Sequence, residues 1–243
     1  MSARAHALKQ VQSRFANTDS ARLEQEISTN GYAVIPGALD RQECTELRSL
    51  YEHTDRFRNR VVMARHNFGQ GEYQYFKYPL PPLIDELRHD LYPLLAPVAN
   101  AWSERLSIDA RYPASLDEFL KLCHRAGQTR PTPLLLKYAE GDYNRLHQDL
   151  YGATQFPLQA TILLSRPGDD FDGGEFVLVE SAPRTQSRAE IVPLSEGDMV
   201  VFAVNARPVA STRGFKRVAL RHGVARVRAG HRMTLGLIFH DAA

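Results

Sequence analysis

Two features of the sequence predict a mainly β core with helical support, an α+β arrangement. From Pro131 onward, about eight short segments rich in Leu, Val and Ile alternate with turns over roughly 110 residues, a spacing typical of an all-β barrel or jelly roll. Before that point, apolar residues recur mostly at helical intervals. We therefore expect one compact unit made of a helix-rich support segment over 1–130 and a β core over 131–243.

The first region is expected to be mostly helical, with a few short strands. Helical spacing runs through residues 1–30, where Asp19 can cap a second helix. Asp40 can open a further helix, because Glu43 stands three residues on, as in a capping box. Long helices are then expected over 82–106, with a break at Pro93 or Pro97, and over 116–124. Strands are expected over 31–35, 61–63 and 73–78.

The second region is expected to consist of strands joined by turns and one long connection. The predicted strands are 134–138, 143–149, 159–164, 175–179, 191–194, 198–202, 218–227 and 232–239. The stretch over 203–217 is expected to be a loop, since it is long for a connection between jelly-roll strands and long loops are often functional.

Bulk properties limit the classes of protein that fit. A chain of 243 residues with 43% hydrophobic content suits one packed domain, and a net charge of +2 is too mild to imply nucleic acid by itself. Cys44 and Cys123 are far apart and predict buried thiols in a reducing compartment. Neither a signal peptide nor a membrane-spanning apolar run is recognisable. We expect a cytoplasmic protein with no membrane contact and no obligate protein partner.

The stretch around His147 and Asp149 carries the first chemical signal. Side chains two residues apart in a strand point to the same face, so these two can address one point in space. Two histidines and one carboxylate on one face of an octahedron are typical of non-haem Fe(II) oxygenases. His53 and Asp55 have the same spacing but follow a helical pattern, in which such residues do not face each other.

A third ligand is expected from further along the chain. His222 lies in the predicted seventh strand, which can neighbour the second strand in a double-sheet jelly roll. His231 and His240 are the alternatives: His231 has the wrong parity relative to Arg232, and His240 lies near the end of the chain. The preferred metal ligands are therefore His147, Asp149 and His222.

Arg232 indicates what else the core binds. A buried arginine facing the interior needs an anionic partner, and a guanidinium binds a carboxylate in bidentate fashion. A 2-oxo diacid fits, with its oxo-acid end on the metal and its far carboxylate on Arg232. Thr234 shares the face of Arg232, and Tyr138 on the first core strand can donate a further hydrogen bond. Tyr138 has a simpler interpretation as a packed aromatic side chain.

In order and spacing, these residues resemble the 2-oxoglutarate- and Fe(II)-dependent oxygenases. The resemblance covers 131–241, with a weaker match over 31–55, and its further motifs are Gly141-Asp142, Gly173-Gly174-Glu175, Gly197-Asp198 and Gly230. It implies a double-stranded β-helix core, and a dioxygenase that uses Fe(II), 2-oxoglutarate and O₂. Such an enzyme hydroxylates a substrate C–H bond and releases succinate and CO₂.

The resemblance leaves the primary substrate open. The C-terminal half looks like a bacterial subgroup held to demethylate damaged DNA bases oxidatively. AlkB-type repair enzymes carry a second arginine six positions after the first, and here that position is Ile238. The ten-residue spacing from His222 to Arg232 is instead like that of prolyl-hydroxylase-type members. A hydroxylase of a peptide, amino acid or other small molecule is the alternative, and a cupin-like metal-binding module is the non-enzyme alternative.

The basic stretch over 203–221 is a candidate substrate clamp. It holds several cations and no acid, and it leads directly into His222, so its tip is expected to overhang the metal. Arg213, Arg217 and Arg221 are therefore candidate substrate-binding residues, together with Tyr151, which follows Asp149. Nucleic acid is then a candidate partner. The simpler interpretation is a solvated loop whose charges pair with Asp or Glu elsewhere.

Overall fold

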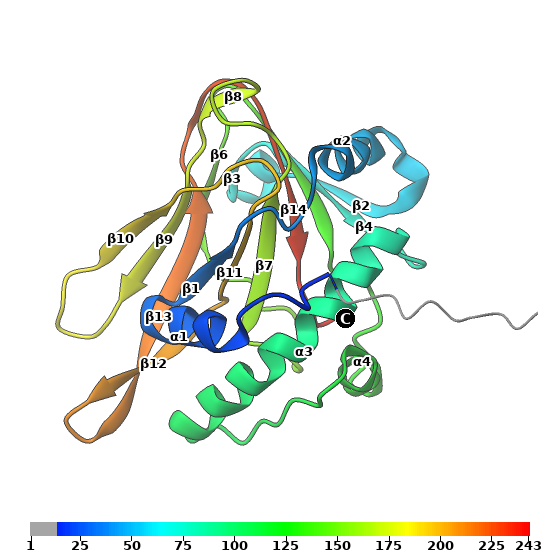
Figure 1. Ribbon diagram of the computed structural model, residues 1–243. Helices are drawn as coiled ribbons and strands as arrows, with labels where there is room; N and C mark the ends of the chain where they lie inside the picture. Colours follow the sequence, from blue (N-terminus) through cyan, green and yellow to red (C-terminus); the bar gives the residue numbers. More distant parts are fainter. Residues whose placement is uncertain (1–13) are drawn as a thin grey trace, which may run out of the picture.

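A computed structural model describes residues 14–243 and shows two antiparallel sheets with helices packed against one of them (Figure 1). The first helix expected within residues 1–18 falls largely outside the described residues. The helices are α1 (Ser20–Asn30), α2 (Arg41–Ser49), α3 (Pro82–Arg105) and α4 (Leu116–Arg125). Short 3₁₀ turns are η1 (Leu50–Glu52), η2 (Thr54–Arg56) and η3 (Met63–His66).

The strands of the first half are β1 (Tyr32–Ile35), β2 (Phe57–Val62), β3 (Gly69–Gln70) and β4 (Glu72–Phe76). Those of the second half are β5 (Leu134–Ala139), β6 (Tyr143–His147), β7 (Leu158–Leu163), β8 (Phe171–Gly173), β9 (Phe176–Ser181), β10 (Arg188–Val192), β11 (Met199–Ala203), β12 (Ala206–Ser211), β13 (Gly214–Val224) and β14 (Val227–Leu237).

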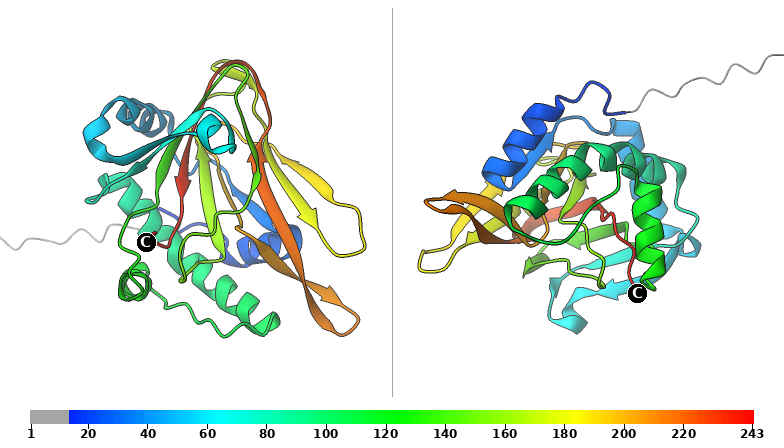
Figure 2. Two further views of the ribbon diagram at one scale, coloured as in Figure 1. Left: turned by 180° about the vertical axis from the view of Figure 1, so that it is seen from behind. Right: turned by 90° about the horizontal axis from the view of Figure 1, so that it is seen from below.

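The larger sheet has the order β1-β11-β7-β14-β5-β4-β2, and β8 pairs with β14 at one end. The smaller sheet has the order β10-β9-β13-β6-β3, with β12 paired to β13. Seen from behind, the two sheets lie close together at the end that carries β8 and diverge toward the opposite end (Figure 2). This arrangement confirms the predicted jelly roll with helical support. Strands β1, β2 and β4 from the first 130 residues extend the larger sheet.

Strand alternation divides the side chains of the larger sheet between two faces. In β14, Leu235 and Leu237 join the main apolar core, whereas Arg232 and Thr234 line a cavity between the sheets. In β7, Ile162 points to the same core. The larger sheet therefore separates an apolar core under the helices from a cavity on its other face, which holds Arg232 and Thr234.

Helix α3 supplies much of that core, and it is continuous. The predicted break at Pro93 or Pro97 is wrong. Both prolines lie on the exposed side of the helix, one turn apart, so the carbonyl groups that lose a helical hydrogen bond can face water. On the opposite side Leu87, Leu91 and Leu95 are fully buried, and this packing outweighs the cost of the prolines.

The long loop predicted over 203–217 is also wrong, because this stretch forms the β12–β13 hairpin, paired from Ala206↔Ala219 to Ser211↔Gly214. Gly214 has a φ of 94°, which suits the tight turn at its tip. The hairpin projects from the body of the fold, as β9–β10 does (Figure 1). Among the described residues, no helix is both long and apolar enough to cross a membrane.

Candidate active site

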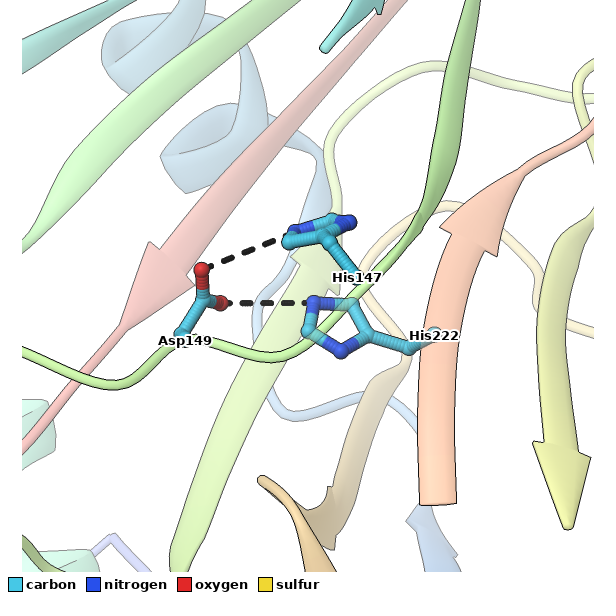
Figure 3. A group of neighbouring side chains, drawn as sticks. All are labelled: His147, Asp149 and His222. Atoms are coloured by element: carbon cyan, nitrogen blue, oxygen red, sulfur yellow. Dashed lines mark ion pairs between the residues drawn. The ribbon is translucent and has the colours of Figure 1, made fainter. Parts of the chain in front are cut away.

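The smaller sheet brings two distant histidines together. His147 at the end of β6 and His222 in β13 are direct partners in the antiparallel register. Their ring centroids are 4.2 Å apart. Asp149 follows β6 by two residues and turns its carboxylate toward both rings, 3.5 Å from His147 Nε2 and 3.3 Å from His222 Nε2 (Figure 3). One ligand atom from each residue lies within 4.8 Å of the others.

Neighbouring groups orient Asp149 within this cluster. The Tyr151 hydroxyl donates to Asp149 Oδ1 at 2.8 Å, and Gln159 Nε2 donates to Oδ2 at 2.8 Å. Burial opposes ionisation of this carboxyl, but the hydrogen bond and charge of His222 hold its pKa below the ordinary value. The group is thus an ionised, fixed anion between two imidazoles, which suits a divalent cation.

The orientation of His147 is set by the backbone. Its Nδ1 lies 2.7 Å from the carbonyl oxygen of Arg145, which can only accept a hydrogen bond. The proton therefore belongs on Nδ1, and the lone pair of Nε2 faces Asp149. Burial, followed by the nearby His222, lowers the pKa of His147, so the ring favours the neutral form in which imidazole binds metals.

Behind the cluster lies a cavity of about 390 Å³ that also contains Arg232. Arg232 is 1% exposed, and its Nε and Nη1 atoms have no hydrogen-bond partner in the described structure. Burial lowers the pKa of this guanidinium to about 10. The cation lies 5.7 Å above the ring centroid of Tyr138, whose own pKa burial raises to about 12. A buried guanidinium with unused donors is a site for an anion.

The space around Arg232 depends on Gly174. A Cβ atom at this position would stand 2.8 Å from Arg232 Cδ, and the residue has a φ of 62°. A larger residue would therefore displace the guanidinium and strain the backbone. Gly174 thus shapes the anion site, whereas Gly173 leaves room for the backbone of Arg226 and Arg228.

The other predicted residues divide into two groups. Thr234, Tyr138 and Tyr151 line the cavity with the histidine cluster. Arg213, Arg217 and Arg221 do not. The expectation that the tip of the basic stretch overhangs the metal is wrong, because Gly214 and His222 are eight residues apart in one extended strand, about 26 Å.

The alternative ligands lie elsewhere. His231 is exposed on β14, and the Nδ1 atom of His240 accepts from the Phe156 amide at 3.2 Å. His53 is exposed beside η1. None of the three belongs to the histidine–aspartate cluster.

Sequence reasoning missed the residues that hold the cluster in place. Gln159 stands at the start of a predicted strand, where alternation was the only available signal that it faces inward. Tyr75 extends the network, since its hydroxyl donates to that of Tyr151 at 3.2 Å. The contact of His147 with the Arg145 carbonyl could not be predicted from residue types, because every residue has a backbone carbonyl group.

The fold and the site define a 2-oxoglutarate- and Fe(II)-dependent oxygenase. A model of the Oxygenase-NA family, described as "oxygenase, catalysing oxidative methylation of damaged DNA", matches residues 71–242. The chain belongs to this family. It is also 50% identical over 168 residues to an uncharacterized protein of Mycobacterium tuberculosis, a match that covers 69% of this chain and 72% of that one.

Solved structures show the same fold at low sequence identity. A prolyl-4-hydroxylase of Pseudomonas putida has a TM-score of 0.54 at 15% identity, over 92% of this chain and all of that one. A 2OG-Fe(II) oxygenase family oxidoreductase of Burkholderia pseudomallei has a TM-score of 0.51 at 18% identity, over 92% and 93% of the two chains. These neighbours show the fold, while the histidine–aspartate cluster and the unused donors of Arg232 suit Fe(II) and 2-oxoglutarate.

Proposed function

We propose that this oxygenase removes methyl groups from damaged nucleobases by oxidising the N-methyl carbon, which then leaves as formaldehyde. His147, Asp149 and His222 hold Fe(II), and Arg232 binds the far carboxylate of 2-oxoglutarate with Thr234 and Tyr138. The observation that carries the proposal is that the unpartnered Arg232 and the histidine–aspartate cluster share one cavity.

The residues present fit both groups. Two neutral imidazoles and a fixed carboxylate match the ligand set that non-haem Fe(II) prefers, and the unused donors of Arg232 match a carboxylate. Fe(II) with bound 2-oxoglutarate supplies the activation of O₂ for C–H hydroxylation. The protein residues orient the ligands: Tyr151 and Gln159 fix Asp149, and the Arg145 carbonyl fixes His147.

The wall of the cavity suits a flat, weakly polar ring. Tyr73, Tyr75 and Tyr151 line it, and Tyr73 meets Tyr75 edge to face with centroids 5.4 Å apart. Aromatic rings accept planar ligands by stacking, as in enzymes that draw a base out of its strand. The family description names damaged DNA as the target. Oxidation of an N-methyl carbon removes the methyl group from the base, so we read the oxidative reaction as demethylation.

One observation favours a second candidate, a hydroxylase of a peptide, amino acid or other small molecule. Ile238, six residues after Arg232, lines the cavity where AlkB-type enzymes carry a second arginine. The fold is also that of prolyl hydroxylases. Ile238 cannot make the hydrogen bonds and charge contacts that an arginine at this position would make. Its presence therefore favours a substrate other than a nucleobase.

Turnover with a substrate panel distinguishes the two candidates. Protein loaded with Fe(II) and 2-oxoglutarate is given single-stranded oligonucleotides with an N-methylated base, matched unmethylated oligonucleotides, proline-containing peptides and free amino acids. The proposal expects succinate above background, with equimolar formaldehyde, from methylated oligonucleotides alone. Succinate stimulated by peptides or amino acids, with no formaldehyde, would establish the second candidate instead. His147→Ala serves as the inactive control.

A further inference from the structure

A second cavity, of about 420 Å³, lies next to the first one. It is formed by the C-terminal end of α3, the segment after it and the loop that follows Asp149. Leu150 of this loop lines both cavities. Among the residues that the structure describes, the lining of the second cavity includes Arg111 and Arg217 and no acidic side chain. The two cavities are therefore neighbours, and the second is biased toward an anion.

The outer face of β13 connects the basic residues. Arg217 and Arg221 are four residues apart, so they share one face of the strand about 13 Å from each other. Both are exposed. Within residues 14–243 neither forms an ion pair, and Arg217 donates only to the neutral Asn205 Oδ1, at 2.6 Å. Arg207 of the same hairpin differs, because Glu180 binds it at 2.7 Å. The charges of Arg217 and Arg221 are thus available to a ligand.

Apolar side chains stand exposed around the mouth of the first cavity. Phe68 is 48% exposed, Leu146 46% and Leu150 44%. All three line the cavity that holds the histidine–aspartate cluster. Phe68 offers a ring on which a base can stack, and Arg217, which lines the second cavity together with Leu150, offers a charge for a phosphate. Proteins bind single-stranded nucleic acid by these two kinds of contact.

We propose that the second cavity binds a neighbouring nucleotide of the nucleic-acid strand whose damaged base enters the first cavity. The strand crosses Leu150, and Arg217 and Arg221 contact its phosphates. This inference rests on the proposed function and deepens it, since it names an unpaired polynucleotide, rather than a free base or nucleotide, as the substrate. A small acid needs one arginine, whereas only a polymer reaches both cavities.

The test measures binding of a fluorescent single-stranded oligonucleotide against salt concentration. The protein carries Fe(II) and 2-oxoglutarate under anaerobic conditions, so that no turnover occurs. Arg217→Ala/Arg221→Ala is compared with Arg184→Ala/Arg213→Ala, which removes the same charge from the projecting ends of the two hairpins (Figure 1). Thermal unfolding of each variant shows that it is folded.

We expect the Arg217/Arg221 variant to lose about 1.4 from the salt slope, about 0.7 for each phosphate contact, and to bind about tenfold more weakly at moderate salt. The control variant should bind within about twofold of wild type. Arg111→Ala, in the second cavity, should weaken binding of an oligonucleotide but not of a methylated mononucleotide.

The outcomes separate this inference from the proposed function. Equal losses in the two double variants would mean a general charge effect and would overturn the inference. Demethylation of a mononucleotide by wild type as efficiently as of an oligonucleotide would also overturn the inference, because the second cavity would then contribute nothing to substrate binding. Absence of any nucleic-acid binding or demethylation by wild type would instead overturn the proposed function, and the inference with it.

Discussion

His147 and His222 are register partners in neighbouring antiparallel strands, with their rings 4.2 Å apart and tilted by 50°. This pairing joins residues 75 positions apart and sets them on one face beside Asp149. Because the backbone hydrogen bonds of a sheet fix the register, the position of one histidine determines that of the other. The metal site therefore depends on the β6–β13 ladder as much as on the side chains.

Loss of either histidine should abolish metal binding. His147→Ala and His222→Ala each remove one of three ligands, so we expect affinity for Fe(II), or for Mn(II) as a stable probe, to fall by more than about 100-fold. Calorimetric titration of the metal measures this. His53→Ala is the matched control, because His53 belongs to the other His-x-Asp sequence, and it should bind like wild type. Wild-type affinity in His222→Ala would show that another residue completes the site.

Arg232→Ala should weaken 2-oxoglutarate binding selectively. Loss of one partner of a buried charge pair costs about 3–5 kcal/mol, which corresponds to an increase in KM of about two to three orders of magnitude or more. Steady-state succinate formation gives the KM, and metal titration should remain near wild type. Arg226→Ala, an exposed arginine of the preceding turn, is the control. An increase of less than about threefold would place the carboxylate elsewhere.

Gly174→Ala should act through Arg232. The new Cβ would crowd Arg232 Cδ, whereas Gly168, whose φ of 83° is similarly unfavourable for alanine, has nothing within 4 Å. Both variants carry backbone strain, of about 1 kcal/mol. We expect only Gly174→Ala to raise the KM for 2-oxoglutarate, by about tenfold or more. If the two variants behave alike, strain alone accounts for the effect of Gly174.

Tyr151→Phe should lower metal affinity. It removes the hydroxyl that donates to Asp149 Oδ1 at 2.8 Å but keeps the ring. Loss of such a supporting hydrogen bond costs about 10–100-fold in metal affinity. Tyr73→Phe is the control, because Tyr73 lines the same cavity, whereas the hydroxyl and amide hydrogen bonds to Asp149 among the described residues come from Tyr151 and Gln159. Metal titration of both variants decides whether Tyr151 positions the ligand or only contacts substrate.

His240 should make stability depend on pH. Burial lowers its pKa to about 4 in the folded protein, below the ordinary value of 6.5. The unfolded chain therefore binds the extra proton between these values, and stability falls as the pH drops from about 6.5 to 4. The difference in pKa corresponds to about 3 kcal/mol.

Urea unfolding of the metal-free protein between pH 7 and pH 4 measures this loss. His240→Asn keeps an acceptor for the Phe156 amide but does not titrate, so its stability should fall by less over the same range. Parallel pH profiles for wild type and variant would assign the loss to other groups.

Short sequence patterns predicted the helix starts and strands that depend on residues close together in the chain. The Asp40 capping box is present, with Asp40 accepting from the Glu43 amide and Glu43 accepting from the Asp40 amide. The turn and alternation signals from Leu134 onward located most strands of the core, but not β8 or β12. Where local preference and packing conflict, as at Pro93 and Pro97, the sequence pattern predicted a break that the buried face of α3 prevents.

The local sequence pattern was enough to predict the jelly-roll class, His147 and Asp149 as a ligand pair, and a buried Arg232 in need of an anion, although Asp149 lies beyond the end of β6 and not in the strand. These depend on alternation and composition, which act over a few residues. The packing of distant segments was needed to show that His222 faces His147, that Gln159 and Tyr151 hold Asp149, and that the tip of the β12–β13 hairpin lies away from the metal site. Such relations depend on strand register across the sheets, and register is set by packing between segments far apart in the chain.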